Sequence, residues 1–189
     1  MNPSEAREHL DMVERIVAAS SRKLEAGGEY FLVWGVASGT MELLLQLASD
    51  GRIPASAVWA GPGLFLLAFA FSVFRSRYYR MCPVGRVSSL QREFFNVLWI
   101  TLSMALATNV IGSHIFTDWA GAAIWNVAAA IVLFYIAMHG NRRALAGGIM
   151  LVVSVAFANF NMPIAGYALA AGMYLGYAGF GLADLLARE

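Results

Sequence analysis

The sequence predicts an all-α fold: a polytopic membrane helix bundle with six transmembrane helices in three antiparallel hairpins, preceded by an N-terminal amphipathic cytoplasmic helix. Three observations support this prediction. Charged residues make up only 13% of the 189 residues and apolar residues 59%, whereas soluble domains carry about 25% charged residues. Six apolar stretches follow one another with short connections. Lysine and arginine are concentrated in alternate connections, which is typical of membrane proteins.

Each apolar stretch is long enough to cross a hydrocarbon core about 30 Å thick as an α-helix, which takes roughly 17 to 25 residues. Uniform apolarity favours helices over barrel strands, because barrel strands alternate polar and apolar residues. We divide the chain into residues 1–28, the amphipathic helix, and residues 29–189, the transmembrane domain. The predicted spans run from Tyr30 to Ala48, Ala55 to Phe74, Phe94 to Phe116, Trp119 to Met138, Ala144 to Phe160 and Pro163 to Leu185.

The basic residues predict the orientation of the spans. Twelve of the thirteen Lys and Arg residues fall in the amino-terminal segment, the second and fourth connections and the carboxyl-terminal tail, and only Arg52 lies on the other side. Connections rich in Lys and Arg stay in the cytoplasm. An even number of spans then places both termini in the cytoplasm, and we expect a multi-pass protein of the cell inner (plasma) membrane. No signal peptide is expected, because charges occur throughout the first 28 residues.

Residues 2–26 are predicted to form a helix that binds protein. Asn2 can cap it, Pro3 suits its first turn, and Glu5 completes a capping box. An apolar stripe at helical spacing follows. Membrane-surface helices usually have a Lys- and Arg-rich polar face, but here five acids stand against four bases. We therefore expect the stripe to contact a cytoplasmic protein partner, or the basic connection between the second and third spans.

Glu42 is the one charged side chain clearly predicted at membrane depth. Charged groups there usually face the bundle interior or a hydrated cavity, and they are candidates for function. The same helical face carries Gly35, Ser38 and Gly39 before Glu42 and Gln46 after it. Small residues allow close approach of a neighbouring helix. Glu42 is therefore expected to point inward.

Polar residues of other spans lie at a similar predicted depth. Counting 1.5 Å per residue from the extracytoplasmic ends places Glu42, Asn109, Asn126 and Ser154 about 9 to 10 Å deep, with Thr108 close by and Gln46 nearer the surface. A pocket open to the extracytoplasmic side would explain this coincidence. The alternative is that the Asn and Ser side chains join neighbouring helices by hydrogen bonds. The candidate ligand-binding residues are Glu42, Gln46, Thr108, Asn109, Asn126 and Ser154.

The sixth span carries a stripe of small residues, Ala168, Gly172 and Gly176. Such a stripe lets two helix backbones approach closely. Packing within the bundle is favoured over a homo-oligomer contact through Gly172 and Gly176, because six helices offer many internal interfaces.

The sequence offers little support for catalysis, cofactors or nucleic-acid binding. No HExxH, GxSxG or Walker motif occurs. His114 and His139 are predicted at opposite ends of their spans, and Cys82 is the only cysteine, so neither a metal site nor a disulfide is expected. The net charge is only +1 and the basic residues occur in short clusters, unlike a nucleic-acid-binding face.

Two functions remain compatible with these patterns. The first is a binding or transport protein that takes a small solute or ion into the polar pocket around Glu42. The second is a non-transporting membrane scaffold or signalling partner that acts through its N-terminal helix and its basic second connection. The shared depth of the polar groups favours the first.

Overall fold

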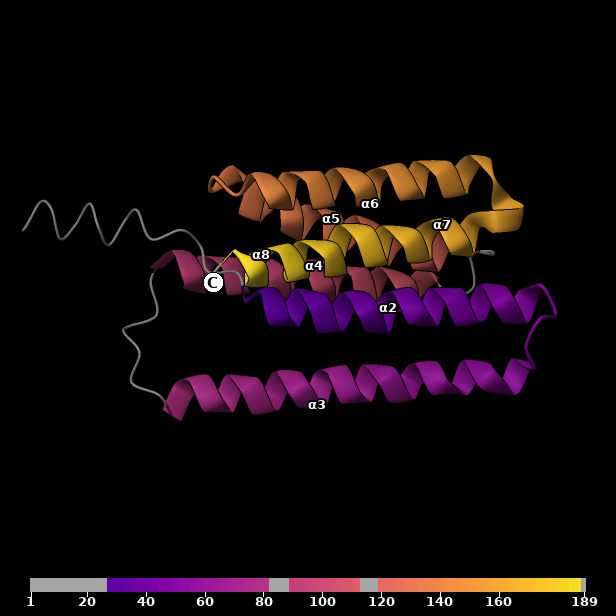
Figure 1. Ribbon diagram of the computed structural model, residues 1–189, viewed down its shortest axis with the longest axis horizontal. Coiled ribbons are helices and arrows are strands. Elements are labelled where there is room, and N and C mark those ends of the chain that lie inside the picture. The colour runs from indigo at the N-terminus through magenta and orange to yellow at the C-terminus, as the bar shows by residue number, and fades with distance from the viewer. Residues whose placement is uncertain (1–26, 82–88, 113–118, 188–189) are drawn as a thin grey trace, which may run out of the picture.

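The computed structural model describes residues 27–81, 89–112 and 119–187, with the backbone alone for residues 76–81 and 89–92. Every regular element in these ranges is helical (Figure 1). The elements are α2 (Gly28–Ser49), η1 (Ala55–Trp59), α3 (Ala60–Met81), α4 (Ser89–Gly112), α5 (Ala120–Met138), α6 (Arg142–Phe160), η2 (Met162–Ile164), α7 (Ala165–Gly172), η3 (Met173–Ala178) and α8 (Gly179–Leu186). The all-α prediction is confirmed for this part of the chain, whereas the predicted helix over residues 2–26 lies outside it.

Six described helical segments are long and apolar enough to cross a membrane, as predicted. Their bounds differ from the predicted ones by a few residues for local reasons. The fifth span begins at Arg142 because the Asn141 side chain caps the helix, accepting from the backbone N–H groups of Arg143 and Ala144. The second begins as a 3-10 turn, and its α-helix starts at Ala60.

The sixth span is not a uniform α-helix. The α-helical segments α7 and α8 are joined by the π-helix η3, Met173–Ala178. A π turn widens the helix locally and is often found at functional sites. In η3 the Tyr174 hydroxyl lies 2.7 Å from the Thr40 hydroxyl of α2, and Tyr177 packs against Phe31 with ring centroids 5.0 Å apart.

The helices divide into a packed centre and two outlying spans. α2 packs against the whole sixth span, and α6 packs against both α5 and the sixth span. α3 packs mainly on α2, and α4 mainly on α5; in Figure 1, α3 lies at the edge of the bundle beside α2. Large apolar side chains on α3 and α4, such as Phe74 and Met104, are exposed. Lipid hydrocarbon would cover such surfaces at no cost.

The small residues of the sixth span pack inside the chain. A Cβ added at Gly176 would lie 2.7 Å from the Gly147 carbonyl oxygen of α6, and one added at Gly35 would lie 2.5 Å from the Ala178 backbone nitrogen. Such approaches leave no room for a side chain. Gly172 and Gly176 are both buried against other helices of the same chain. We therefore do not propose a homo-oligomer contact through them.

Polar contacts join α3 to α2. The Arg75 guanidinium donates two hydrogen bonds of 2.6 Å to the Glu29 carboxylate, and the Trp34 indole N–H donates to the Ser72 hydroxyl at 2.9 Å. A bidentate Arg–carboxylate pair fixes orientation as well as distance. α3 is therefore held by specific contacts despite its small buried surface.

Candidate functional site

Three of the predicted site residues meet in the centre of the bundle. Glu42 of α2, Asn126 of α5 and Ser154 of α6, called here the polar triad, are 5%, 0% and 8% exposed. The Asn126 amide N–H donates to Glu42 Oε1 at 2.7 Å. The Ser154 hydroxyl lies 3.4 Å from Asn126 Oδ1. Sequence reasoning placed these residues at one depth, and the structure also places them on facing sides of their helices.

Asn126 is the link between the two other members of the triad. Its side-chain nitrogen is directed to Glu42, and the distance from the same nitrogen to the Ala122 carbonyl oxygen is longer, at 3.4 Å. The Ser154 hydroxyl has one proton and donates it at 2.7 Å to the Leu151 carbonyl, so its 3.4 Å contact to Asn126 is weak. The well-formed hydrogen bond in the triad is therefore the one between Asn126 and Glu42.

The second carboxyl oxygen of Glu42 has no hydrogen-bond partner. Oε2 is buried and lacks a partner among the described residues. Buried polar atoms are nearly always hydrogen-bonded, so each exception needs an explanation. A carboxyl group with one open oxygen in an apolar bundle is suited to holding a bound cation, a proton or a hydrogen-bond donor.

Gly172 of α7 closes the triad from the side of the sixth span. A Cβ at this position would collide with the Ser154 hydroxyl and lie 3.1 Å from Asn126 Oδ1. Four helices thus meet at the triad, and a glycine is needed in one of them. The sequence predicted that Gly172 packs against another helix, but it did not predict that its neighbours are Ser154 and Asn126 of the polar triad.

Gln46 is buried one turn beyond Glu42 but makes different contacts. Its amide nitrogen donates to Asp50 Oδ1 at 2.8 Å and to the Pro163 carbonyl at 3.1 Å, and its Oε1 accepts from the Gly166 N–H at 2.9 Å. The Tyr167 hydroxyl donates to Asp50 Oδ2 at 2.7 Å. Gln46, Asp50 and Tyr167, called here the outer clasp, join the end of α2 to the start of the sixth span.

Asp50 is the titratable group of the outer clasp that lies outside the spans. The hydrogen bond from the Tyr167 hydroxyl, followed by that from the Gln46 amide, lowers the pKa of Asp50 below its ordinary value of 3.8. Both hydrogen bonds favour the ionised form. Asp50 and Tyr167 were not among the predicted site residues: Asp50 lies outside the predicted spans, and Tyr167 lies near the start of the sixth, where an aromatic residue is ordinary.

Thr108 and Asn109 do not join the polar triad. The Thr108 side chain is exposed, and its hydroxyl donates to the Met104 carbonyl of its own helix at 2.7 Å. The Asn109 nitrogen donates to the Ala105 carbonyl at 3.1 Å, and its Oδ1 would lie 2.8 Å from a Cβ at Gly121 of α5. Depth was predicted from residue counts, but the rotation of α4 about its axis directs these side chains elsewhere.

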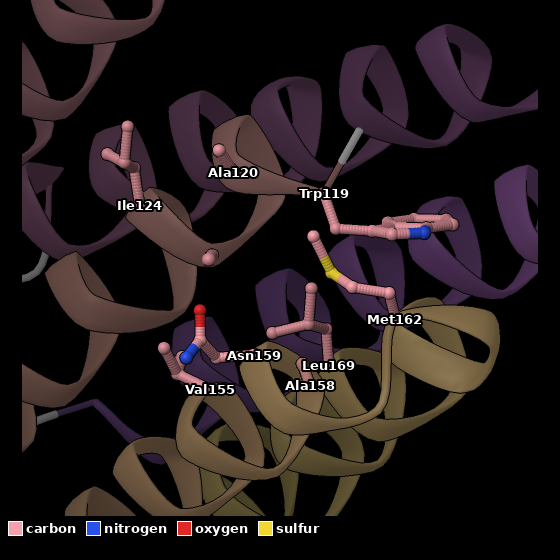
Figure 2. A pocket seen from close by; sticks show the side chains of 9 residues that line it. Trp119, Ala120, Ile124, Val155, Ala158, Asn159, Met162 and Leu169 are labelled. Carbon is pink, nitrogen blue, oxygen red and sulfur yellow. The ribbon is translucent and has the colours of Figure 1, made fainter. Parts of the chain in front are cut away.

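An apolar cavity lies at the end of the bundle where α6 joins the sixth span, called here the outer end. The cavity, called the outer pocket, has a volume of about 270 Å³. Figure 2 shows Asn159 and Met162 extending from one side of it, with Trp119, Ala120 and Ile124 of the α5 end on the other. Its lining residues are Trp119, Ala120, Ala123, Ile124, Val155, Ala158, Asn159, Met162 and Leu169.

The outer pocket lies one helical turn from the triad. Ala123 precedes Asn126 by three residues, Ala158 follows Ser154 by four, and Leu169 precedes Gly172 by three. One turn of an α-helix rises roughly 5 Å. Leu169 and Ala158 are 0% and 4% exposed, so they form a closed apolar layer between the outer pocket and the triad.

The described residues contain no group of three or more His, Cys, Asp or Glu side chains that could hold a metal ion. Comparison with protein-family models, with curated proteins and with solved structures finds no match to this chain. The geometry of the polar triad, the outer clasp and the outer pocket is therefore the basis for the function proposed next.

Proposed function

We propose that this chain is a small polytopic integral membrane protein that binds or transports a small solute or ion through an extracytoplasmic-facing polar pocket around Glu42. The observation that carries the proposal is the unpartnered Oε2 of Glu42, a carboxyl oxygen buried among apolar helices. Burying such a group without a partner carries a free-energy cost, and ionisable groups inside membrane bundles commonly mark functional sites.

The proposal places the six helices across the cell inner (plasma) membrane as three antiparallel hairpins. Contacts between consecutive spans, α2 with α3, α4 with α5 and α6 with α7, support this arrangement. The carboxyl-terminal part of α3 and the amino end of α6, which carry Arg75, Arg142 and Arg143, lie at the end of the bundle opposite the connection that follows α2 (Figure 1). The rule that positive residues stay inside then places both termini in the cytoplasm and the outer end outside.

The chemistry of the triad indicates which ligands suit it. Asn126 satisfies Oε1 of Glu42 and holds the carboxyl in place, so Oε2 is the atom left for the ligand. Hydrogen bonds to an ionised carboxylate are roughly twice as strong as neutral ones. A proton, a monovalent cation or an ammonium group would therefore bind Glu42 most favourably.

Access to the triad is closed in this conformation. The apolar layer of Ala158 and Leu169 covers it on the side of the outer pocket, and the outer clasp holds α2 to the sixth span. A protein that binds from outside would have to separate these contacts. Within the outer clasp the exposed hydrogen bond from Tyr167 to Asp50 would open most readily, whereas the bonds of the buried Gln46 would have to break for full access.

Uptake into proteoliposomes tests the proposal. Radiolabelled methylammonium and sodium would be offered from the side corresponding to the outer end, with an inside-negative potential. Glu42→Gln is expected to reduce uptake of at least one of these ions to the level of protein-free vesicles. Glu29→Gln is the matched control, since Glu29 lies on the same helix and pairs with Arg75 away from the triad; it should retain uptake. Equal uptake by the parent and Glu42→Gln would contradict the proposal.

The alternative function, a non-transporting scaffold or signalling partner, depends on residues 2–26 and on the basic connection over residues 75–93. Residues 2–26, and residues 82–88 of the connection, lie outside the described residues, so that function stays a prediction from the sequence. We likewise propose a non-enzymatic role, because the sequence carries no catalytic motif and the polar triad contains one carboxyl group without a second acid or base.

A further inference from the structure

The outer pocket combines an apolar wall with a polar site directly beneath it. Eight of its nine lining residues are aliphatic or aromatic or contain a thioether, and Asn159 is the single amide. None of the nine is charged. Ligand pockets commonly have this composition, with many apolar contacts and a few polar groups that set orientation.

The size of the outer pocket limits its ligand. Its volume of about 270 Å³ lies just below the roughly 300 to 1,000 Å³ of pockets for drug-sized molecules. A cavity of about 150 Å³ is large enough to bind benzene, so the outer pocket has room for one aromatic ring or a short branched alkyl group. Trp119 and Met162 are adaptable surfaces for such a group, since tryptophan also attracts cations and methionine packs against aromatic rings.

The charge near the outer pocket favours a cation over a neutral molecule or an anion. Glu42 lies beneath the layer formed by Ala158 and Leu169, with one carboxyl oxygen open. The described cation nearest to it in the outer loop, Arg52, is 69% exposed and faces Asp50 at 3.9 Å. Arg52 is thus directed at Asp50 and leaves the second Glu42 carboxyl oxygen open to a positive ligand.

We propose that the outer pocket and Glu42 together recognise a small organic cation, an amine with one compact apolar group, whose apolar group occupies the outer pocket and whose ammonium group binds Glu42 Oε2. This inference rests on the proposed function and specifies its substrate class. Leu169 lines the outer pocket and precedes Gly172, which closes the triad, by three residues, so displacement of the Leu169 side chain would join the two parts. Asn159 is placed to orient the ligand at the mouth.

The test compares two probes that differ in charge and share one shape. Benzylammonium is a cation at neutral pH, and benzyl alcohol is its neutral counterpart. Each would be titrated into the full chain in lipid nanodiscs by calorimetry, with empty nanodiscs as the blank. Benzylammonium is expected to bind the parent at least about tenfold more tightly than benzyl alcohol, which corresponds to about 1.4 kcal/mol.

Variants separate the two parts of the site. Ala123→Leu places three additional carbons in the outer pocket and is expected to weaken benzylammonium binding by about tenfold or more. Ala120→Leu fills the pocket from the neighbouring turn of α5 and is expected to have the same effect, so it replaces Ala123→Leu if that variant folds poorly. Ala107→Leu is the matched control, because Ala107 is exposed on α4, and it should bind benzylammonium like the parent. Glu42→Gln should remove the preference for the charged probe.

Failure of this inference differs from failure of the proposed function. Equal affinity for the two probes, or parent-like benzylammonium binding by both folded pocket variants, would overturn the organic-cation inference while Glu42-dependent ion uptake still stood. Uptake that is the same in the parent and Glu42→Gln would overturn both.

Discussion

The hydrogen bond between Asn126 and Glu42 makes the most quantitative prediction. Replacing either residue by leucine removes the 2.7 Å contact between the Asn126 nitrogen and Glu42 Oε1 and leaves a side chain of similar size. In the parent, Asn126→Leu leaves both oxygens of a buried carboxyl group without a partner. In a Glu42→Leu background the same change removes no such bond. Asn126→Leu should therefore cost more in the parent, and the difference is the coupling energy of the pair.

The expected coupling is about 1 to 2 kcal/mol. Hydrogen bonds between membrane helices contribute about 0.6 kcal/mol on average and up to about 1.7, whereas bonds to charged groups contribute about 1.5 to 3. The Asn126–Glu42 bond is short, and its residues are 0% and 5% exposed. A value in the upper part of the membrane range follows, because water cannot replace the lost partner.

The assay is a double-mutant cycle on equilibrium unfolding, with the chain in mixed micelles titrated with a denaturing detergent and followed by tryptophan fluorescence. Glu42 with Asn109 is the control pair, since the two share a predicted depth but Asn109 contacts its own helix and faces Gly121. That pair should be additive within about 0.5 kcal/mol. A coupling for Glu42 with Asn126 no larger than that of the control pair would refute the described geometry of the triad.

Two further predictions concern the contacts around the triad. Gly172→Ala should lower stability by about 1 to 3 kcal/mol, because its Cβ would collide with Ser154, whereas Gly179→Ala should be neutral or slightly stabilising, because the nearest atom lies 3.5 Å away; thermal unfolding in detergent measures both, and equal stability of the two variants would be inconsistent with this packing. The pKa of Asp50 is lowered in the folded chain, so its contribution to stability is fully present above about pH 3.8 and is lost as the pH falls through the lower folded value. The midpoints of the parent and Asp50→Asn should therefore differ by a constant amount from pH 5 to 8 and converge only below about pH 4; convergence at higher pH would show that the clasp does not lower this pKa.

Much of the fold was predictable because apolar length and charge clustering are properties of contiguous sequence. The six spans needed only counts of residues, whereas the predicted start of the fifth span at Ala144 missed the local signal of the Asn141 cap. The π turn at Met173–Ala178 was not predictable, since it depends on how Tyr174 and Tyr177 pack against α2. The outlying positions of α3 and α4 also depend on contacts between distant segments.

The candidate site was predictable in part for a related reason. Depth follows from residue number at 1.5 Å per residue, and it correctly grouped Glu42, Asn126 and Ser154. Rotation of each helix about its axis is set by packing, so depth could not show that Thr108 is exposed or that Gln46 bonds to the start of the sixth span. Asp50 lies outside the predicted spans, and Tyr167, near the start of the sixth, could not be distinguished from an interfacial aromatic residue.

Selective carboxyl modification of the full chain in lipid vesicles, followed by peptide mass spectrometry, would show whether Glu42 is an acid enclosed within a membrane bundle. Dicyclohexylcarbodiimide enters lipid, whereas a water-soluble carbodiimide does not. We expect the lipid-soluble reagent to modify Glu42, and the water-soluble reagent to modify exposed acids such as Glu93 but to leave Glu42 intact. Modification of Glu42 by the water-soluble reagent as readily as Glu93, or no modification of Glu42 by the lipid-soluble one, would contradict the enclosed position of Glu42.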